Sequence, residues 1–355
     1  MKKSLLALAV LGAFAGAASA QSSVTLFGVV DLSGNYIKNG SANTWNLASN
    51  QLNSNRLGFR GVEDLGGGLK AGFWLEAGMD NASGFAGGGS GNVSNGDAST
   101  AQFFNRRSTV SLFSPWGELR LGRDYLPSFW NIVYDDVNGA NGLGQGLNII
   151  STLNTGTAAS IARLNNTIGY FLPGNLGGVY GQAMVAAGQG TPGQKYYGGR
   201  VGWAAGPIDV NFGYGSYKTL PNISDLKVIN AGGSYDFGFL KVFGYYNRDT
   251  FANLKQNVYE LSVSVPMGQG ELRSSYAHAD SSGRTAALVV TDANDANLYS
   301  IEYVYNLSKR TALYTTAAQI KNKGLASFSV LPGTNSTNLA GNKSSGYNLG
   351  VRHSF

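Results

Sequence analysis

Residues 259–265 read Tyr259-Glu260-Leu261-Ser262-Val263-Ser264-Val265. Every second side chain in this stretch is apolar or aromatic, and the side chains between them are polar. Because successive side chains of a β-strand point to opposite faces of the sheet, the pattern predicts a strand with one apolar and one polar face. The fold is decided by what covers the apolar face of such strands.

The same period of two recurs along the chain, for example at 69–73, 209–214, 299–303 and 347–352. Turn residues divide the sequence into sixteen such segments. Their predicted bounds are 24–37, 52–63, 68–80, 103–113, 117–124, 163–172, 178–188, 195–204, 208–217, 226–235, 239–249, 256–265, 271–280, 297–306, 310–321 and 345–355. After Ala20, no apolar run reaches the ~20 residues that a membrane-spanning helix needs.

The connections between these segments alternate in length. Seven are short and rich in the Gly, Pro, Asn and Asp that tight turns require, namely 64–67, 114–116, 173–177, 205–207, 236–238, 266–270 and 307–309. The other eight are mostly longer and polar, namely 38–51, 81–102, 125–162, 189–194, 218–225, 250–255, 281–296 and 322–344. The short turns therefore lie on one side of the sheet, together with both termini.

This organisation is typical of an even-stranded barrel in the bacterial outer membrane, with short periplasmic turns and long external loops. Such a barrel is closed because the N–H and C=O groups of an open sheet edge would stay unpaired in lipid. The residues thus predict an all-β chain that forms a transmembrane 16-stranded antiparallel β-barrel. A secreted β-sandwich or β-helix is the rival fold, but the sequence shows no domain break and no repeat period.

Composition narrows the classes of function. Only 13% of the residues are charged, about half of the ~25% usual for soluble domains, whereas Gly is abundant with 51 residues. The absence of Cys excludes disulfides and thiol chemistry, and two His give little material for zinc or acid–base chemistry. The formal charge of +6 is spread along the chain without a basic stripe. We therefore predict no enzyme activity, no cofactor, no metal and no nucleic-acid partner.

The N-terminus is typical of a secretory signal peptide. A basic start with Lys2 and Lys3 precedes fourteen apolar or small residues, 5–18, and Ala18-Ser19-Ala20 offers a small-x-small cleavage site. At ~1.5 Å per residue the apolar run is too short to cross the ~30 Å hydrocarbon core as a helix. We predict a cleaved signal peptide at 1–20 and a single barrel domain at 21–355, exported through the periplasm, with a formal charge of +4.

Four stretches resemble the general porins of β-proteobacteria, which are related to the neisserial porins. They are Ser23-Val24-Thr25-Leu26-Phe27-Gly28-Val29-Val30-Asp31, the hairpin from Asn55-Arg56-Leu57-Gly58-Phe59-Arg60-Gly61 to Gly66-Gly67-Gly68-Leu69-Lys70-Ala71, the pair Asn105-Arg106-Arg107-Ser108 and Gly117-Glu118-Leu119-Arg120-Leu121-Gly122-Arg123, and the C-terminal Gly350-Val351-Arg352-His353-Ser354-Phe355. The hairpin and the C-terminus are the most specific of these. The resemblance extends over the whole mature chain.

The resemblance implies a homotrimer of water-filled barrels, each narrowed by a third loop that folds inward. The third connection, 125–162, is also the longest one in this chain. Small hydrophilic solutes and ions would be the substrates, and outer-membrane lipid and lipopolysaccharide would surround the barrel. The terminal Phe355, on an amphipathic last strand, resembles the signal that the barrel assembly machinery reads.

Strand parity identifies candidate pore-lining arginines. Leu57 and Phe59 take the lipid-facing parity, so Arg56 and Arg60 are expected to point inward, and Arg200 does so by the same argument. Simple alternation would send Arg106 outward, where an Arg at mid-bilayer costs ~2–4 kcal/mol, so a bulge or a subunit contact is expected there. The resemblance implies basic pore-wall residues at Arg56, Arg106 and Arg163.

Two acids of the third loop complete the predicted constriction. Asp135 and Asp136 are expected to face the arginines and to set up a transverse field across a narrow polar passage. The excess of arginine predicts a weakly anion-preferring channel for passive diffusion. The alternatives are a channel specific for phosphate, dicarboxylates or sugar, a barrel enzyme, and an adhesin-type barrel.

Overall fold

The structure is a computed structural model of the chain. It describes residues 23–86, 102–150, 153, 160–189, 195–218, 224–285, 288–334 and 339–355. The predicted signal peptide lies outside the described residues. The division into a cleaved segment at 1–20 and one domain at 21–355 therefore stays a prediction.

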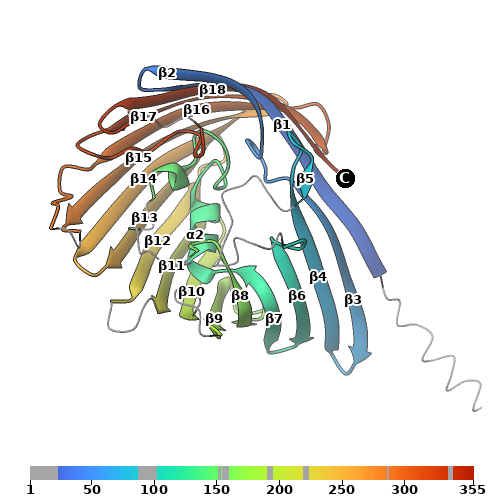
Figure 1. Ribbon diagram of the computed structural model, residues 1–355. Coiled ribbons are helices and arrows are strands. Elements are labelled where there is room, and N and C mark those ends of the chain that lie inside the picture. The colour runs from blue at the N-terminus through green and yellow to red at the C-terminus, as the bar shows by residue number, and fades with distance from the viewer. Residues whose placement is uncertain are drawn as a thin grey trace, which may run out of the picture.

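Sixteen antiparallel strands form the wall of a closed barrel (Figure 1). They are β1 (Ser23–Asn39), β3 (Arg56–Gly66), β4 (Leu69–Asp80), β6 (Arg107–Ser114), β7 (Gly117–Tyr125), β8 (Arg163–Phe171), β9 (Val179–Ala186), β10 (Lys195–Ala205), β11 (Ile208–Lys218), β12 (Leu226–Asp236), β13 (Lys241–Phe251), β14 (Leu254–Met267), β15 (Gly270–Gly283), β16 (Ala296–Asn306), β17 (Thr311–Asn322) and β18 (Lys343–Ser354). The predicted fold and strand number are confirmed.

The barrel closes where β18 pairs with β1, from Val29 opposite Ser354 to Asn39 opposite Ser344. The last residue extends this seam, because the N–H of Phe355 donates to the Gly28 oxygen at 3.1 Å and the Gly28 N–H donates to the Phe355 oxygen at 3.0 Å. The Phe355 ring lies so close to Gly28 that a Cβ at this position would overlap it. Glycine is thus required where the terminal aromatic ring crosses the first strand.

Two further strands, β2 (Ala42–Ser49) and β5 (Phe85–Ala86), extend the loops beyond the wall. β1 is long enough to pair with β2 along one half and with β3 along the other. Segment 38–51 was predicted to be a loop, although its residues also alternate. At 250–255 the predicted loop shrinks to a two-residue turn, with Ala252 at a φ of 52°, because β13 and β14 continue to Phe251 and Leu254.

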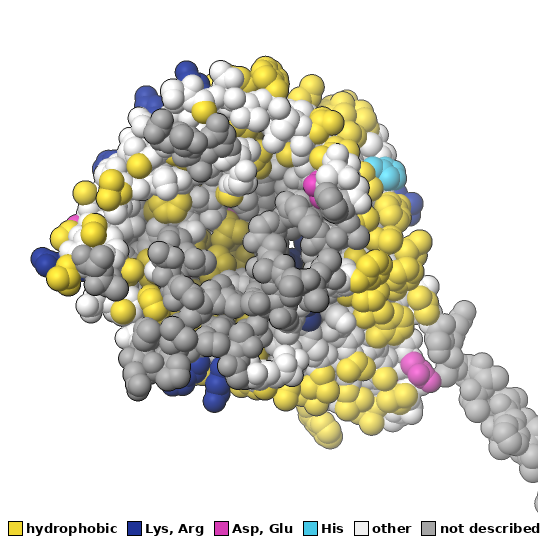
Figure 2. Space-filling view, viewed as in Figure 1, with side chains coloured by type: hydrophobic (Ala, Val, Ile, Leu, Met, Phe, Trp, Pro, Cys, Tyr) yellow, Lys and Arg dark blue, Asp and Glu magenta, His cyan; other side chains and the backbone are white. Residues whose placement is uncertain are grey.

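The two faces of the wall differ as the alternation predicts. On β14, Leu261 is 62% exposed on the outer face, whereas Glu260 and Ser262 are buried on the inner face. Figure 2 shows hydrophobic side chains gathered on the side where β1, β3 and β4 run in Figure 1. Among the described residues, no helix is long and apolar enough to span a membrane.

The third connection fills part of the barrel interior. Its helix α2 (Pro127–Asp135) packs against the inner face of β9 to β13, and its short 3-10 helix η1 (Gly146–Ile149) contacts β15 and β16 (Figure 1). Pro127 stands at the first helical position, where its missing N–H costs no hydrogen bond. Phe129 and Ile132 are buried in an apolar cluster that includes Tyr217 of the wall. The expected inward-folded third loop is confirmed, and its helix anchors it.

Candidate functional site

A cavity of about 760 Å³ lies between the third loop and the inner wall. Arg56, Arg106 and Arg163 line it from the wall side, together with Tyr125. These residues come from β3, the segment before β6, β8 and the end of β7. Three of the predicted constriction residues are thus brought together in one cavity.

A single buried acid holds two of these arginines. Glu76 of β4 accepts a bond of 2.5 Å from the Nε of Arg106, and its Oε1 lies 3.5 Å from the Nη1 of Arg56. The other Glu76 oxygen accepts a bond of 3.0 Å from the indole N–H of Trp74. One carboxylate therefore neutralises only part of the positive charge beside the cavity.

Tyr125 connects the second and third arginine. Its hydroxyl accepts a hydrogen bond of 2.6 Å from the Nη2 of Arg106 and another bond from the Nη2 of Arg163. The guanidinium carbon of Arg163 also lies 3.9 Å from the centroid of the Tyr125 ring. The phenol fixes both guanidiniums without cancelling their charge, because a neutral hydroxyl supplies the acceptor.

Arg106 points into the barrel, which settles the uncertainty left by simple alternation. The ladder between β4 and β6 pairs Glu76 with Arg107, so Arg106 precedes the strand and is free of its parity. The backbone N–H of Arg106 donates to the backbone carbonyl oxygen of Glu76 at 3.1 Å. The Arg106 residue is only 3% exposed. Arg106 and Arg107 therefore both lie opposite Glu76, and this irregularity turns the Arg106 side chain inward.

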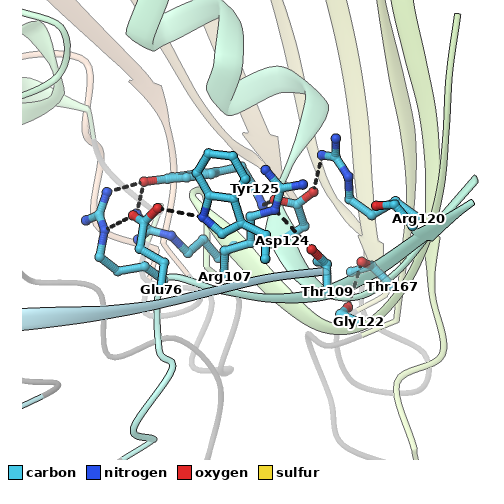
Figure 3. A network of polar contacts seen from close by, with 12 residues as sticks. Glu76, Arg107, Thr109, Arg120, Gly122, Asp124, Tyr125 and Thr167 are labelled. Carbon is cyan, nitrogen blue, oxygen red and sulfur yellow. Dashed lines mark hydrogen bonds and ion pairs between the residues drawn. The ribbon is translucent and has the colours of Figure 1, made fainter. Parts of the chain in front are cut away.

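Next to Glu76 and Tyr125, a charged network continues along β6 and β7 (Figure 3). Arg120 bonds Asp124 at 2.6 Å and Glu118 at 2.7 Å, and Arg107 lies 3.8 Å from Asp124. Sequence reasoning missed these residues as site residues. The parity that placed Arg56 inward would also have placed Arg107, Arg120 and Asp124 inward, because the ladder between β6 and β7 is regular.

Arg60 and Arg200 also face the interior, as predicted, but away from the three-arginine cavity. Arg60 is exposed and stacks beside Trp74, with its guanidinium carbon 5.1 Å from the ring centroid. Arg200 donates to the Asn131 side chain of α2 at 3.4 Å and lies 5.1 Å from the Tyr134 ring. Arg60 therefore extends the basic wall, whereas Arg200 contacts the loop helix.

Asp135 and Asp136 do not face the three arginines, so this part of the prediction needs correction. Asp135 turns toward the wall and accepts bonds of 3.1 and 2.9 Å from the side-chain amide of Asn211. Asp136 accepts from the backbone N–H groups of Asn138 at 2.8 Å and Gly146 at 3.1 Å and so organises the loop itself. Both side chains are buried by these contacts, and neither lines the cavity.

Burial changes the protonation of these two loop acids. It raises the pKa of Asp135 to about 7, although the bonds from Asn211 oppose the shift. Burial also raises the pKa of the Asp136 carboxyl, against the effect of its bonds from backbone amides. Both groups are therefore weaker sources of negative charge near neutral pH than exposed aspartates would be.

Comparisons with known proteins agree with this architecture. The family described as Gram-negative porin matches residues 7–325. The outer membrane porin protein 32 of Delftia acidovorans is 38% identical, with both chains covered completely, and an outer membrane porin of Bordetella pertussis is 28% identical with the same coverage. The solved anion-selective porin from Comamonas acidovorans is 34% identical, with a TM-score of 0.79 over 94% of this chain and 100% of its own. An OmpT structure of Vibrio cholerae, 12% identical with a TM-score of 0.67 over 94% and 98% of the two chains, shares the fold.

Proposed function

We propose that this chain, which belongs to the family of Gram-negative porins, passes small anions more readily than cations through the cavity beside Arg56, Arg106 and Arg163. Family membership makes the chain a porin of the outer membrane, through which small hydrophilic solutes diffuse passively. The preference for anions is the proposed part. The relative from Comamonas acidovorans carries the description anion-selective, which supports it.

The observation that carries the proposal is an unbalanced charge on one wall. The linked charged side chains of this wall are Arg56, Arg60, Arg106, Arg107, Arg120 and Arg163 against Glu76, Glu118 and Asp124, and Asp80 is a further acid of the cavity lining. Six guanidiniums thus stand against four carboxylates. Guanidinium groups stay charged at every pH of interest, so this excess is permanent.

The inward-facing acids of the opposite wall, Glu260 and Glu302, are buried. β14 and β6 are eight wall strands apart in both directions round the ring, and Glu260 of β14 points inward. Glu302 of β16 also points inward, but it bonds Arg273 at 3.1 Å. We therefore assign the unbalanced charge of the passage to the arginine side, and no negative pole to Asp135, Asp136 or these buried acids. An anion is drawn toward the arginine side, and a dipolar solute can orient along the field.

The reversal potential in a salt gradient tests the proposal. Purified protein is inserted into a planar bilayer with potassium chloride at 0.1 M on one side and 1 M on the other. We expect a potential of the sign given by chloride permeation, and we expect Arg163→Ala to move it toward cation permeation. A cation-selective wild type would refute the proposal. The effect should weaken as salt is raised, because the Debye length falls from ~10 Å at 0.1 M to ~3 Å at 1 M.

Further parts of the proposal concern assembly. We propose a homotrimer that meets through outer-face residues near the termini, including Val24, Leu26, Gly28 and Leu57. Val24 is 67% exposed, which supports packing against a partner, and one OmpT structure is described as a trimer form. We also propose contact with lipopolysaccharide, recognition of Phe355 by the barrel assembly machinery, and the absence of enzyme activity. Native mass measurements in mild detergent test the trimer, and monomers alone would contradict it.

A further inference from the structure

The cavity beside the arginines has two unlike walls. The barrel wall presents guanidinium groups, whereas the third loop presents Phe129, Trp130 and Val133 of α2 and Leu147 and Ile150 around η1. Inorganic ions make no favourable contact with apolar side chains, so the passage of such ions does not explain this apolar side. The volume of about 760 Å³ lies in the range of sites that hold small organic ligands.

Trp130 brings an aromatic surface close to the positive charge. Its indole is inclined against the Tyr125 ring at a centroid distance of 4.9 Å, and it stacks on Tyr134 at 5.4 Å with an interplanar angle of 19°. Tyr125 is the residue on which Arg163 stacks and to which Arg106 donates. The indole and the guanidiniums therefore flank the same phenol and face the same cavity.

The arginine side keeps hydrogen-bonding capacity for a ligand. The Nη1 atom of Arg106 is buried and has no hydrogen-bond partner among the described residues, while its Nε and Nη2 bond Glu76 and Tyr125. Arg56 reaches Glu76 only at 3.5 Å. Asp80 also lines the cavity, but its carboxylate already accepts from Ser49 at 2.8 Å. A carboxylate ligand suits such guanidinium donors.

We propose that this cavity binds aromatic carboxylates, with the carboxylate on the arginines and the ring against Trp130. The inference rests on the proposed anion preference and names the class of organic anion that the channel favours. A short aliphatic acid uses only the arginine side, and an uncharged aromatic molecule uses only the loop side. An arene carboxylate uses both, and contact between aromatic rings adds to the area that it buries.

Block of the chloride current in a planar bilayer tests the inference with three probes: benzoate, acetate and benzamide. We expect benzoate to halve the current at about one tenth of the acetate concentration, and benzamide to block more weakly than benzoate. We expect Trp130→Ala to raise the benzoate concentration for half block about tenfold, the equivalent of about 1.4 kcal/mol, and that of acetate less than twofold. Trp130→Phe, which keeps a ring, should restore most of the benzoate effect.

Trp116→Ala is the matched control, because Trp116 is 78% exposed in the turn between β6 and β7 and does not line the cavity. It should leave the ratio of benzoate to acetate block unchanged. Equal block by benzoate and acetate in the wild type would overturn the inference, and so would a Trp130→Ala variant that weakens both probes equally. The reversal potential without organic acid tests the anion preference separately from the binding of aromatic carboxylates. An anion-selective channel without benzoate preference refutes only the inferred binding of aromatic carboxylates. A cation-selective channel refutes the proposed function itself.

Discussion

Replacing Glu76 by Gln tests how the basic wall sets ion preference. Glu76 is the buried acid shared by Arg56 and Arg106, and Gln removes its charge with almost no change in shape. One negative charge disappears beside the cavity, while the three arginines remain. We expect the variant to prefer anions more strongly than the wild type.

The size of the effect follows from Coulomb's law. A chloride ion that passes about 5 Å from the lost charge gains about 0.8 kcal/mol at the dielectric constant of water, or about 0.5 kcal/mol with the screening of 0.1 M salt. This corresponds to an increase of about two- to fourfold in chloride permeability and an equal decrease in potassium permeability, so their ratio rises by about five- to sixteenfold. Both Glu76 oxygens accept hydrogen bonds, one from Trp74 and one from Arg106, so the side-chain NH2 group of Gln places a donor against one of these donors. We therefore also expect a loss of about 1–3 kcal/mol in folding free energy.

The assay is the reversal potential in a potassium chloride gradient. Folding of the variant is checked first, by comparing the gel mobility of heated and unheated samples. Glu63→Gln is the matched control, because Glu63 lies exposed on the same hairpin, near its turn and with the outward parity of Phe59. The control removes the same charge outside the passage and should leave the potential unchanged. An unchanged potential in folded Glu76→Gln, or an equal shift in both variants, would refute the assignment of this wall to the ion path.

Two further predictions follow from the seam and the loop. Deleting Phe355 removes two backbone hydrogen bonds with Gly28, about 2 kcal/mol, and should lower the folded fraction in the outer membrane without altering single-channel conductance; normal assembly would contradict this. Because burial raises the pKa of Asp135 to about 7, the folded state holds a proton that the unfolded chain releases above pH ~4, so stability from this group falls as the pH rises from about 4 to 7. Asp135→Asn should therefore raise the thermal midpoint at pH 8 but not at pH 5, and an equal change at both values would count against the burial of this acid.

The sequence alone predicted the barrel because its evidence is local. A strand such as 259–265 shows its two faces in consecutive residues, and turn residues mark where each strand ends. Sixteen repetitions of this pattern, with short and long connections in alternation, require closure in lipid. The inward direction of Arg56 and Arg60 followed from the same parity, because the β3 ladder is regular at both positions.

Parity failed where the ladder is interrupted. Arg106 stands one residue before β6, and the ladder between β7 and β8 shifts register between Gly122 and Asp124, where β8 carries one residue more than β7. Both irregularities depend on how neighbouring strands pair, which no single segment of sequence reveals. Parity also predicts that Arg107, Arg120 and Asp124 point inward, but only the structure shows their contacts with one another.

The positions of the loop acids were decided entirely by tertiary structure. Asp135 meets Asn211, 76 residues away, and Trp130 meets Tyr125 because α2 folds back over the end of β7. Such contacts depend on the direction in which a helix leaves the wall, and they are fixed by the burial of Phe129 and Ile132 against distant strands. The alternation of residues determines which face of a strand meets water, but only packing between distant segments determines which charges meet each other across that water.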